Sequence, residues 1–206
     1  MEIKTKRLVL KPLGVQYLNS TFQYASDFDT TKFMVYLPSE TMEETLDFLQ
    51  KVEQEWNKNQ PTFYEFAIFF NEKHIGAVSL YLDEEIAKQT PNVTDNKPVG
   101  EFGWIIHKEY WNQGFATEAA KALFDFAVNS LHVNHFIAHC DAENTASYRV
   151  MEKLGMERTK INEGRKNRSS DENRKEYQYE LVIGGRQSML PPFSILSFYF
   201  FHFLLF

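Results

Sequence analysis

The sequence predicts a single α/β domain in which helices cover a mixed β-sheet. Segments rich in aromatic and β-branched residues, typical of strands, alternate with segments of helical periodicity. Three consecutive strand segments in the middle of the chain indicate an antiparallel run, and a strand–helix–strand order after them indicates a crossover. The chain has 206 residues, of which 43% are hydrophobic, so it is long enough and apolar enough for one core.

The expected elements follow the order strand, helix, helix, strand, strand, strand, helix, strand, helix, strand, strand. Their predicted bounds are 2–12, 15–25, 41–56, 63–70, 75–82, 98–107, 117–131, 135–140, 146–154, 156–161 and 176–183. The first strand changes phase midway, which favours a bulge within it. Residues 71–73 form a turn that joins the strands beside it into a hairpin. Gly155 is the expected left-handed end of the helix before it.

The second helix has one of the clearest signatures in the chain. Thr41 and Glu44 form a potential capping box, and apolar residues follow at helical spacing over residues 41–56. Two polar segments, 83–97 and 162–174, are expected to be surface loops. The aromatic strand 63–70 is interpreted as core.

Residues 1–183 form the predicted domain, and residues 184–206 form a C-terminal appendage of different composition. From Leu190 onward the appendage has no charged residue and contains Pro191 and Pro192. That run is shorter than the roughly 20 apolar residues that a membrane-spanning helix needs. The appendage covers an apolar groove or a partner chain, dips into a membrane surface, or is a sequence artefact such as a shifted frame. We favour an artefact or a species-specific extension and do not expect a membrane anchor.

The composition excludes several classes of protein. The formal net charge is −6, and the basic face typical of nucleic-acid binding is lacking, so no nucleic-acid partner is expected. An acidic chain suits cationic partners such as amines, and it also suits simple solubility. The only cysteine, Cys140, excludes an internal disulfide framework and fits a reducing cytosol. The N-terminus lacks the apolar stretch of a secretory signal, so we predict a cytoplasmic protein, either a monomer or a homodimer.

The histidines do not form a metal-binding pattern. His135 and His139 are four positions apart, but they fall in a predicted strand. Four residues of a strand separate two side chains by roughly 13 Å, which is too far for a shared metal ion. No metal site is therefore predicted.

The most informative stretch, residues 100–120, reads GEFGWIIHKEYWNQGFATEAA and runs from strand through a short turn into a helix. Gly114 and Ala116 are small and stand where the helix begins, so a ligand can approach the backbone there. The N–H groups and the dipole of a helix start attract an anion. Gln113–Thr117 is therefore either a phosphate-binding turn or an ordinary tight turn in which Thr117 caps the helix.

The second informative stretch, residues 141–157, reads DAENTASYRVMEKLGME. Asn144 or Thr145 can cap the helix that follows, and Ser147 lies at the same end of that helix. Taken alone, the stretch indicates plain helix capping.

Together the two stretches resemble the GNAT superfamily of acyl-CoA N-acyltransferases, and they are especially similar to its Rim-type branch, whose namesakes acetylate protein N-termini. The ordered motifs that carry the likeness are the strand GEFGW, the turn and helix YWNQGFATEA, the site N-x-x-S and the helix RVMEKLGM. The opening segment TKRLVLKPL also resembles the first strand of this branch. The likeness covers residues 3–183. It implies a mixed, mostly antiparallel sheet flanked by helices, with a V-shaped splay between two central parallel strands.

The resemblance implies acetyl-CoA as cosubstrate and no metal. The pantetheine arm would lie between strands 101–107 and 135–140, and backbone amides of the turn would bind the pyrophosphate. The implied cofactor-binding residues are Ile105, Ile106, Gln113, Gly114, Phe115, Ala116, Thr117 and Asn144. Trp111 stands where the general motif has Gln or Arg, as is common in the Rim-type branch, and Asn112 stands where that branch often has Gly.

N-acetylation requires a neutral amine and a protonated or stabilised thiolate leaving group. By the resemblance, Glu101 faces the gap and is the candidate base, acting directly or through a water. The alternative is that Glu101 attracts a cationic amine without moving a proton. Ser147 would lie near the sulfur and is the candidate acid. Many GNAT enzymes carry a Tyr where this chain has Met151, which cannot donate a proton.

The expected activity is that of an acyltransferase: N-acetylation of a primary amine by direct attack in a ternary complex. The expected acceptor is a protein N-terminal α-amine. Phe33 and Tyr36 fall where such folds place the acceptor and would line its site. The alternative acceptors are a polyamine, an amino acid or an antibiotic. The alternative without catalysis is an acyl-CoA-binding sensor.

Overall fold

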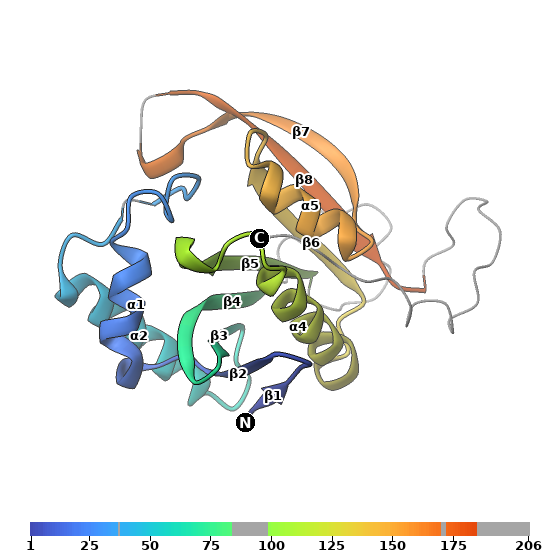
Figure 1. Ribbon diagram of the computed structural model, residues 1–206. Coiled ribbons are helices and arrows are strands. Elements are labelled where there is room, and N and C mark those ends of the chain that lie inside the picture. The colour runs from blue at the N-terminus through green and yellow to red at the C-terminus, as the bar shows by residue number, and fades with distance from the viewer. Residues whose placement is uncertain (37, 84–98, 170–171, 185–206) are drawn as a thin grey trace.

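The computed structural model describes residues 1–36, 38–83, 99–169 and 172–184 (Figure 1). Nearly all of the loop expected at 83–97 and nearly all of the appendage expected at 184–206 lie outside the described residues. In chain order the elements are β1 (Ile3–Lys4), β2 (Leu8–Pro12), a 3-10 turn (Val15–Tyr17), α1 (Leu18–Ala25), α2 (Met42–Trp56), β3 (Phe63–Phe70), β4 (Lys73–Asp83), β5 (Val99–Ile106), a 3-10 turn (Lys108–Tyr110), α4 (Phe115–Leu131), β6 (His135–Asp141), α5 (Thr145–Lys153), β7 (Glu157–Arg165), a 3-10 turn (Asn167–Ser169) and β8 (Arg174–Val182).

Within the described residues, the strands form one eight-stranded sheet in the order β1-β2-β3-β4-β5-β6-β8-β7. Neighbouring strands are antiparallel apart from β5 and β6, which are parallel. The pairing of β5 with β6 runs only from Gly100, opposite Phe136, to Phe102, opposite Ala138. Both strands continue further, β5 as far as Ile106. The sheet therefore splits beyond Phe102, which confirms the predicted splay.

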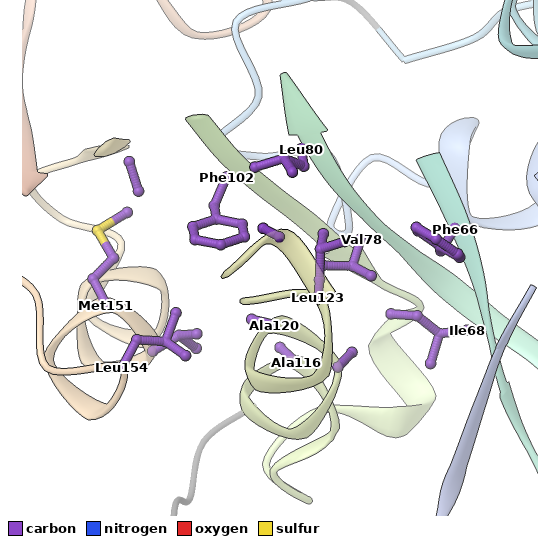
Figure 2. Close-up of a cluster of buried hydrophobic side chains, with 14 of the residues drawn as sticks. Phe66, Ile68, Val78, Leu80, Phe102, Ala116, Ala120, Leu123, Met151 and Leu154 are labelled. Carbon is purple, nitrogen blue, oxygen red and sulfur yellow. The ribbon is translucent and has the colours of Figure 1, made fainter. Parts of the chain in front are cut away.

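Helices cover both faces of the sheet, and strand alternation decides which side chains meet which helices. On β3, Tyr64 and Phe66 belong to a cluster shared with α4 and α5, whereas Ala67 belongs to a cluster shared with α1 and α2. Figure 1 shows the two pairs of helices on opposite sides of the sheet. Figure 2 shows the first cluster, in which the buried Ala116 and Ala120 allow α4 to pack close to the strands.

Two predictions about the strands were wrong. Residues 2–12 are two strands, because the phase change marks a turn in which the Thr5 hydroxyl accepts the Leu8 N–H at 2.8 Å. The loop predicted at 162–174 is too long, since β7 continues to Arg165 and β8 already begins at Arg174. The side chains of β7 are largely exposed, and a hairpin of this kind does not need the apolar alternation that would identify it in the sequence.

Candidate active site

The start of α4 forms a cradle of backbone amides beside the end of β5. Gly114 caps the helix with φ at 78°, a left-handed conformation that glycine adopts without a steric penalty. The first N–H bonded within the helix is that of Glu118, to the Gly114 carbonyl at 3.1 Å, so the amides of Phe115 and Ala116 precede it. Thr117 is buried in the first turn rather than capping the helix, so the alternative of a Thr117 cap was wrong. The geometry fits a phosphate-binding turn.

The two departures from the family motif preserve the shape of this turn. Asn112 is left-handed, with φ at 59°, and Asn is among the few residues other than Gly that tolerate this conformation. The Trp111 indole N–H donates to the Ile106 carbonyl at 2.7 Å, which fastens the turn to the end of β5.

Arg7, from the turn before β2, holds the start of α4 in place. Its Nε donates to the Glu118 carboxylate at 2.7 Å, its Nη1 donates to the Gln113 carbonyl at 2.8 Å, and its guanidinium lies 4.6 Å from the centre of the Phe115 ring. Burial raises the pKa of Glu118, but hydrogen bonds from Thr5 and Arg7 outweigh it, and the pKa is lowered. Arg7 thereby neutralises a carboxylate that would repel a phosphate. Sequence analysis did not single out Arg7, and its only signal was its place in TKRLVLKPL.

Glu101 forms a hydrogen-bonded pair with His139 across β5 and β6. Glu101 Oε1 and His139 Nδ1 are 2.7 Å apart, and about a third of the Glu101 side chain, 32%, is exposed. Burial lowers the pKa of His139, but the hydrogen bond and charge of Glu101 outweigh it, and the pKa is raised. Glu101 lies opposite Ile137, just before the sheet splits. The imidazole holds the carboxylate in place, and the exposed part of the carboxylate remains open to an amine.

Ser147 lies on the other face, at the start of α5. The Asn144 side chain accepts the Ser147 N–H at 3.0 Å, so the residue that caps α5 is Asn144 and not Thr145. Burial raises the pKa of the Cys140 thiol to about 12, although the Ser147 hydroxyl acts to lower it. Cys140 is thus a packed, protonated thiol. Since His139 and Cys140 are consecutive on β6 and point to opposite faces, Glu101 and Ser147 lie on opposite sides of the sheet.

Met151 occupies the position where the resembling enzymes carry a Tyr. It is 1% exposed and belongs to the core cluster around α4. Figure 2 shows Met151 and Leu154 on the inner side of α5. This position therefore contributes packing and no proton donor.

The segment after α1 is fastened to the β7–β8 connection. The Phe33 carbonyl accepts a hydrogen bond from Arg165 Nη2 at 2.9 Å, and the Met34 carbonyl accepts the Arg168 N–H at 2.7 Å. Phe33 is half-buried, and Tyr36 is 53% exposed. Figure 1 shows the two segments meeting beyond the helices α1 and α2. The structure thus frames one side of the face on which Glu101 lies.

Sequence analysis missed a carboxyl on the same face as Glu101. Glu65 of β3 pairs with Ser79 of β4, which pairs with Gly103 of β5. Glu65 is 7% exposed, and burial raises its pKa to about 8. The signal was a single carboxylate within the aromatic strand FYEFAIFF, which we interpreted as core.

Two surface hollows border these elements. One, of about 670 Å³, lies between the start of the chain and α4 and is lined in part by Thr117 and Glu118. The other, of about 520 Å³, is lined in part by Tyr24 and His74. Glu101 lines neither of these two hollows, and strand geometry is what defines the candidate site. Over the described ranges, no cluster of His, Cys, Asp or Glu could hold a metal ion, and no helix is long and apolar enough to cross a membrane.

Known proteins are similar to this chain in sequence or in fold. Residues 7–157 match the family described as acetyltransferase (GNAT) domain. The uncharacterised N-acetyltransferase YnaD from Bacillus subtilis is 30% identical over 163 residues, which cover 77% of this chain and 84% of YnaD.

Two solved structures are similar in fold. An acetyltransferase from Salmonella typhimurium that modifies the N-terminal serine of ribosomal protein L7/L12 has a TM-score of 0.73 at 14% identity, covering 89% of this chain and 99% of that one. The microcin C7 self-immunity acetyltransferase MccE, solved with acetyl-CoA and AMP, has a TM-score of 0.70 at 16% identity, covering 87% of this chain and 94% of that one.

Proposed function

The chain belongs to the GNAT acetyltransferase family, and from this premise we propose that it transfers the acetyl group of acetyl-CoA to a primary amine in the cytoplasm. One arrangement carries the proposal. The amide cradle of α4 lies beside the strand β5, whose edge is open beyond Phe102, and the Glu101–His139 pair lies just before that opening. The amides of α4 can therefore bind the anionic part of a cosubstrate while its reactive group lies beside β5, close to the Glu101–His139 pair.

The residues around the split fit acetyl-CoA. Backbone amides from Gln113 to Thr117 would hold the pyrophosphate, and the open edge of β5 near Ile105 and Ile106 would pair with the pantetheine arm. Bound acetyl-CoA supplies the acetyl thioester.

Glu101 has the contacts of a base in this proposal. Its carboxylate, held by His139, accepts the proton of an incoming ammonium, directly or through a water, and the neutral amine attacks the thioester carbonyl in a ternary complex. Ser147, on the far side of the sheet, serves as the donor for the leaving thiolate. Met151 offers no donor, which keeps a non-catalytic acyl-CoA sensor as an alternative outcome of the assay.

We propose a protein N-terminal α-amine as the acceptor. The likeness of fold to the Salmonella typhimurium enzyme supports this acceptor, and Phe33 and Tyr36 lie on the segment that would receive the chain end. The second candidate is a small-molecule amine. The hydrogen bonds that hold this segment to Arg165 and Arg168 favour the small-molecule amine, because a segment fixed at the edge of the site leaves room for a compact acceptor.

Thiol release from acetyl-CoA tests the function. The acceptor panel contains peptides beginning with Ser, Ala or Met, together with spermidine and free amino acids. Turnover with a peptide and not with spermidine supports the N-terminal acceptor, and turnover only with a small amine supports the second candidate. Binding of CoA without turnover on any acceptor favours the sensor, and a protein that binds no CoA refutes the proposal.

A further inference from the structure

We infer that Glu65 is the carboxylate that binds the ammonium group of the acceptor, and that it gives up its own proton to solvent when the acceptor binds. The inference rests on the proposed function and names a specificity-determining residue for it. The ligand chemistry is an alkylammonium group, whether this belongs to a peptide N-terminus or to a polyamine.

The first observation is that Glu65 is buried without a cation beside it. Glu65 is only 7% exposed, and this burial raises the pKa of its carboxyl to about 8. Among the described residues, no Lys, Arg or His contributes to that pKa. An ionised carboxylate in such a place costs several kcal/mol unless a cation joins it. In the protein without acceptor, the Glu65 carboxyl therefore stays protonated. A bound ammonium compensates the charge of the carboxylate, so the carboxyl can then ionise.

The second observation is the position of Glu65 on the sheet. It lies two strands from β5, on the same face as Glu101 and two residues further along. With strands about 4.8 Å apart and a rise of about 3.3 Å per residue, the two Cα atoms are about 12 Å apart. Ser79 and Gly103, which lie level with Glu65 on the next two strands, are small, and a Cβ on Gly103 would lie only 2.6 Å from Ser79 Oγ. Tyr81 lies opposite Glu101 and stacks on Phe63, so the face between the two carboxyl groups is low beside Glu65 and bounded by an aromatic ring beside Glu101.

The third observation is that three phenols lie within electrostatic reach of Glu65. Tyr24 from α1 is buried, and both its burial and the charge of Glu65 raise its pKa. Tyr36 from the following segment and Tyr81 from β4 are about half exposed, and the charge of Glu65 acts to raise the pKa of each. Glu101 also acts on Tyr81, which connects the two carboxyl groups electrostatically. Aromatic rings beside a carboxylate suit an alkylammonium group, because the ring faces attract a cation, and the exposed rings of Tyr36 and Tyr81 leave a way in from solvent.

Helix α2 also packs against this part of β3, and it contributes a hydrogen bond rather than a charge. Trp56 Nε1 donates to the Glu65 main-chain carbonyl at 3.2 Å and so holds the backbone that carries the carboxyl. The titratable groups that interact with Glu65 among the described residues are therefore three phenols that stay neutral at physiological pH.

The proton balance makes the inference measurable. The acceptor enters as an ammonium ion, the Glu65 carboxyl becomes a carboxylate, and one proton leaves to solvent. A carboxyl with a pKa of about 8 is about 90% protonated at pH 7 and about 10% protonated at pH 9. A primary alkylammonium of spermidine stays charged over this range, so its binding should release nearly one proton at pH 7 and about a tenth of one at pH 9, with an affinity about fivefold higher at pH 8 than at pH 7. A peptide α-amine has a pKa of about 7.7–8.0, so it should also release protons at pH 7 but take up protons on binding at pH 9, and its affinity should rise by less than fivefold.

The experiment is calorimetry of acceptor binding to the full-length protein loaded with CoA. The probes are spermidine and a peptide beginning with Ser, each titrated in two buffers of different ionisation enthalpy at pH 7 and pH 9. The Glu65→Gln variant should bind the active probe at least tenfold more weakly and release no proton. Glu65→Asp should keep the proton release, because it restores a carboxyl. Glu72→Gln, an exposed carboxyl in the turn of the same hairpin, is the matched control and should behave like the wild type.

Steady-state thiol release separates this inference from the proposed function. Glu65→Gln should raise the acceptor KM at least tenfold and leave the KM for acetyl-CoA unchanged. An unchanged acceptor KM and an unchanged proton count in Glu65→Gln would overturn the inference while leaving the acetyltransferase intact. A wild-type protein that binds CoA but acetylates neither probe nor any other amine of the panel fails the proposed function instead. The arm that responds, peptide or spermidine, identifies the source of the ammonium.

Discussion

The buried carboxyl of Glu65 should leave a mark on the stability of the empty protein, and that mark can be measured without any substrate. Its pKa is about 8 in the folded protein, against a usual value of 4.5. Between these values the folded protein keeps a proton that the unfolded chain releases. The stabilisation is therefore fully present below about pH 4.5 and is lost as the pH rises toward 8. At about 1.4 kcal/mol per pKa unit, the loss from pH 5 to pH 8 is about 3 kcal/mol.

Replacement of Glu65 with Gln removes this loss, because the amide is neutral at every pH and nearly the same size as the protonated carboxyl. Other groups also titrate in this range. Burial lowers the pKa of His74 to about 4, so His74 makes stability rise with pH up to about 6.5 and opposes the effect of Glu65. His139 acts in the direction of Glu65, since its pKa is raised. The difference between wild type and variant cancels both histidines.

The assay is urea unfolding of the two proteins at pH 5, 6, 7 and 8, with the free energy of unfolding extrapolated to water. The variant should gain about 3 kcal/mol relative to wild type between pH 5 and pH 8. A difference that stays constant within about 0.5 kcal/mol over that range would show that Glu65 ionises freely in the fold, and the argument from its burial would fail.

Three further predictions concern the cofactor and catalytic residues. Arg7→Ala should weaken acetyl-CoA binding about tenfold, measured by calorimetry, and should lower the free energy of unfolding by about 1–3 kcal/mol, because Glu118 loses its cation. Equal affinity of the variant and the wild type for acetyl-CoA would contradict the positioning role of Arg7. Gly114→Ala should cost about 1–2 kcal/mol in unfolding experiments, since φ is 78° there, and should weaken acetyl-CoA binding; a neutral variant would mean that the turn reshapes. Glu101→Gln should lower kcat by about 10²–10⁴ with an unchanged KM for acetyl-CoA, and Ser147→Ala should lower kcat about tenfold; full turnover in both variants would refute the catalytic assignment.

The fold was predictable wherever a segment carries its own signal. The turn before β4 contains Asn71 and Glu72, both left-handed, and the strands on either side form the expected hairpin. Gly155 ends its helix with φ at 82°, as a left-handed stop. The β7–β8 hairpin could not be bounded, because its exposed strands lack alternation and its charged residues look like a loop.

The candidate site was predictable in part, for a related reason. The cradle at Gly114 is local in sequence, and its glycine stands in a motif that pairs with a second motif further along the chain. Glu101 could be placed on a strand facing the gap, but its partner His139 is 38 residues away. Arg7 reaches Glu118 across 111 residues, and no local pattern connects the two.

Local patterns in the sequence were enough to predict the order of most elements, the helix start that fits a phosphate and the faces on which strand residues alternate. These features depend on neighbours within a few positions, where spacing and backbone preference act directly, and two such motifs taken together indicated the family. Tertiary packing was needed to place Glu65 on the face of Glu101, Ser147 on the other face, and Arg7 against the start of α4. Those relations depend on which strands pair and in what register, and register is set by long-range packing of the whole sheet against its helices.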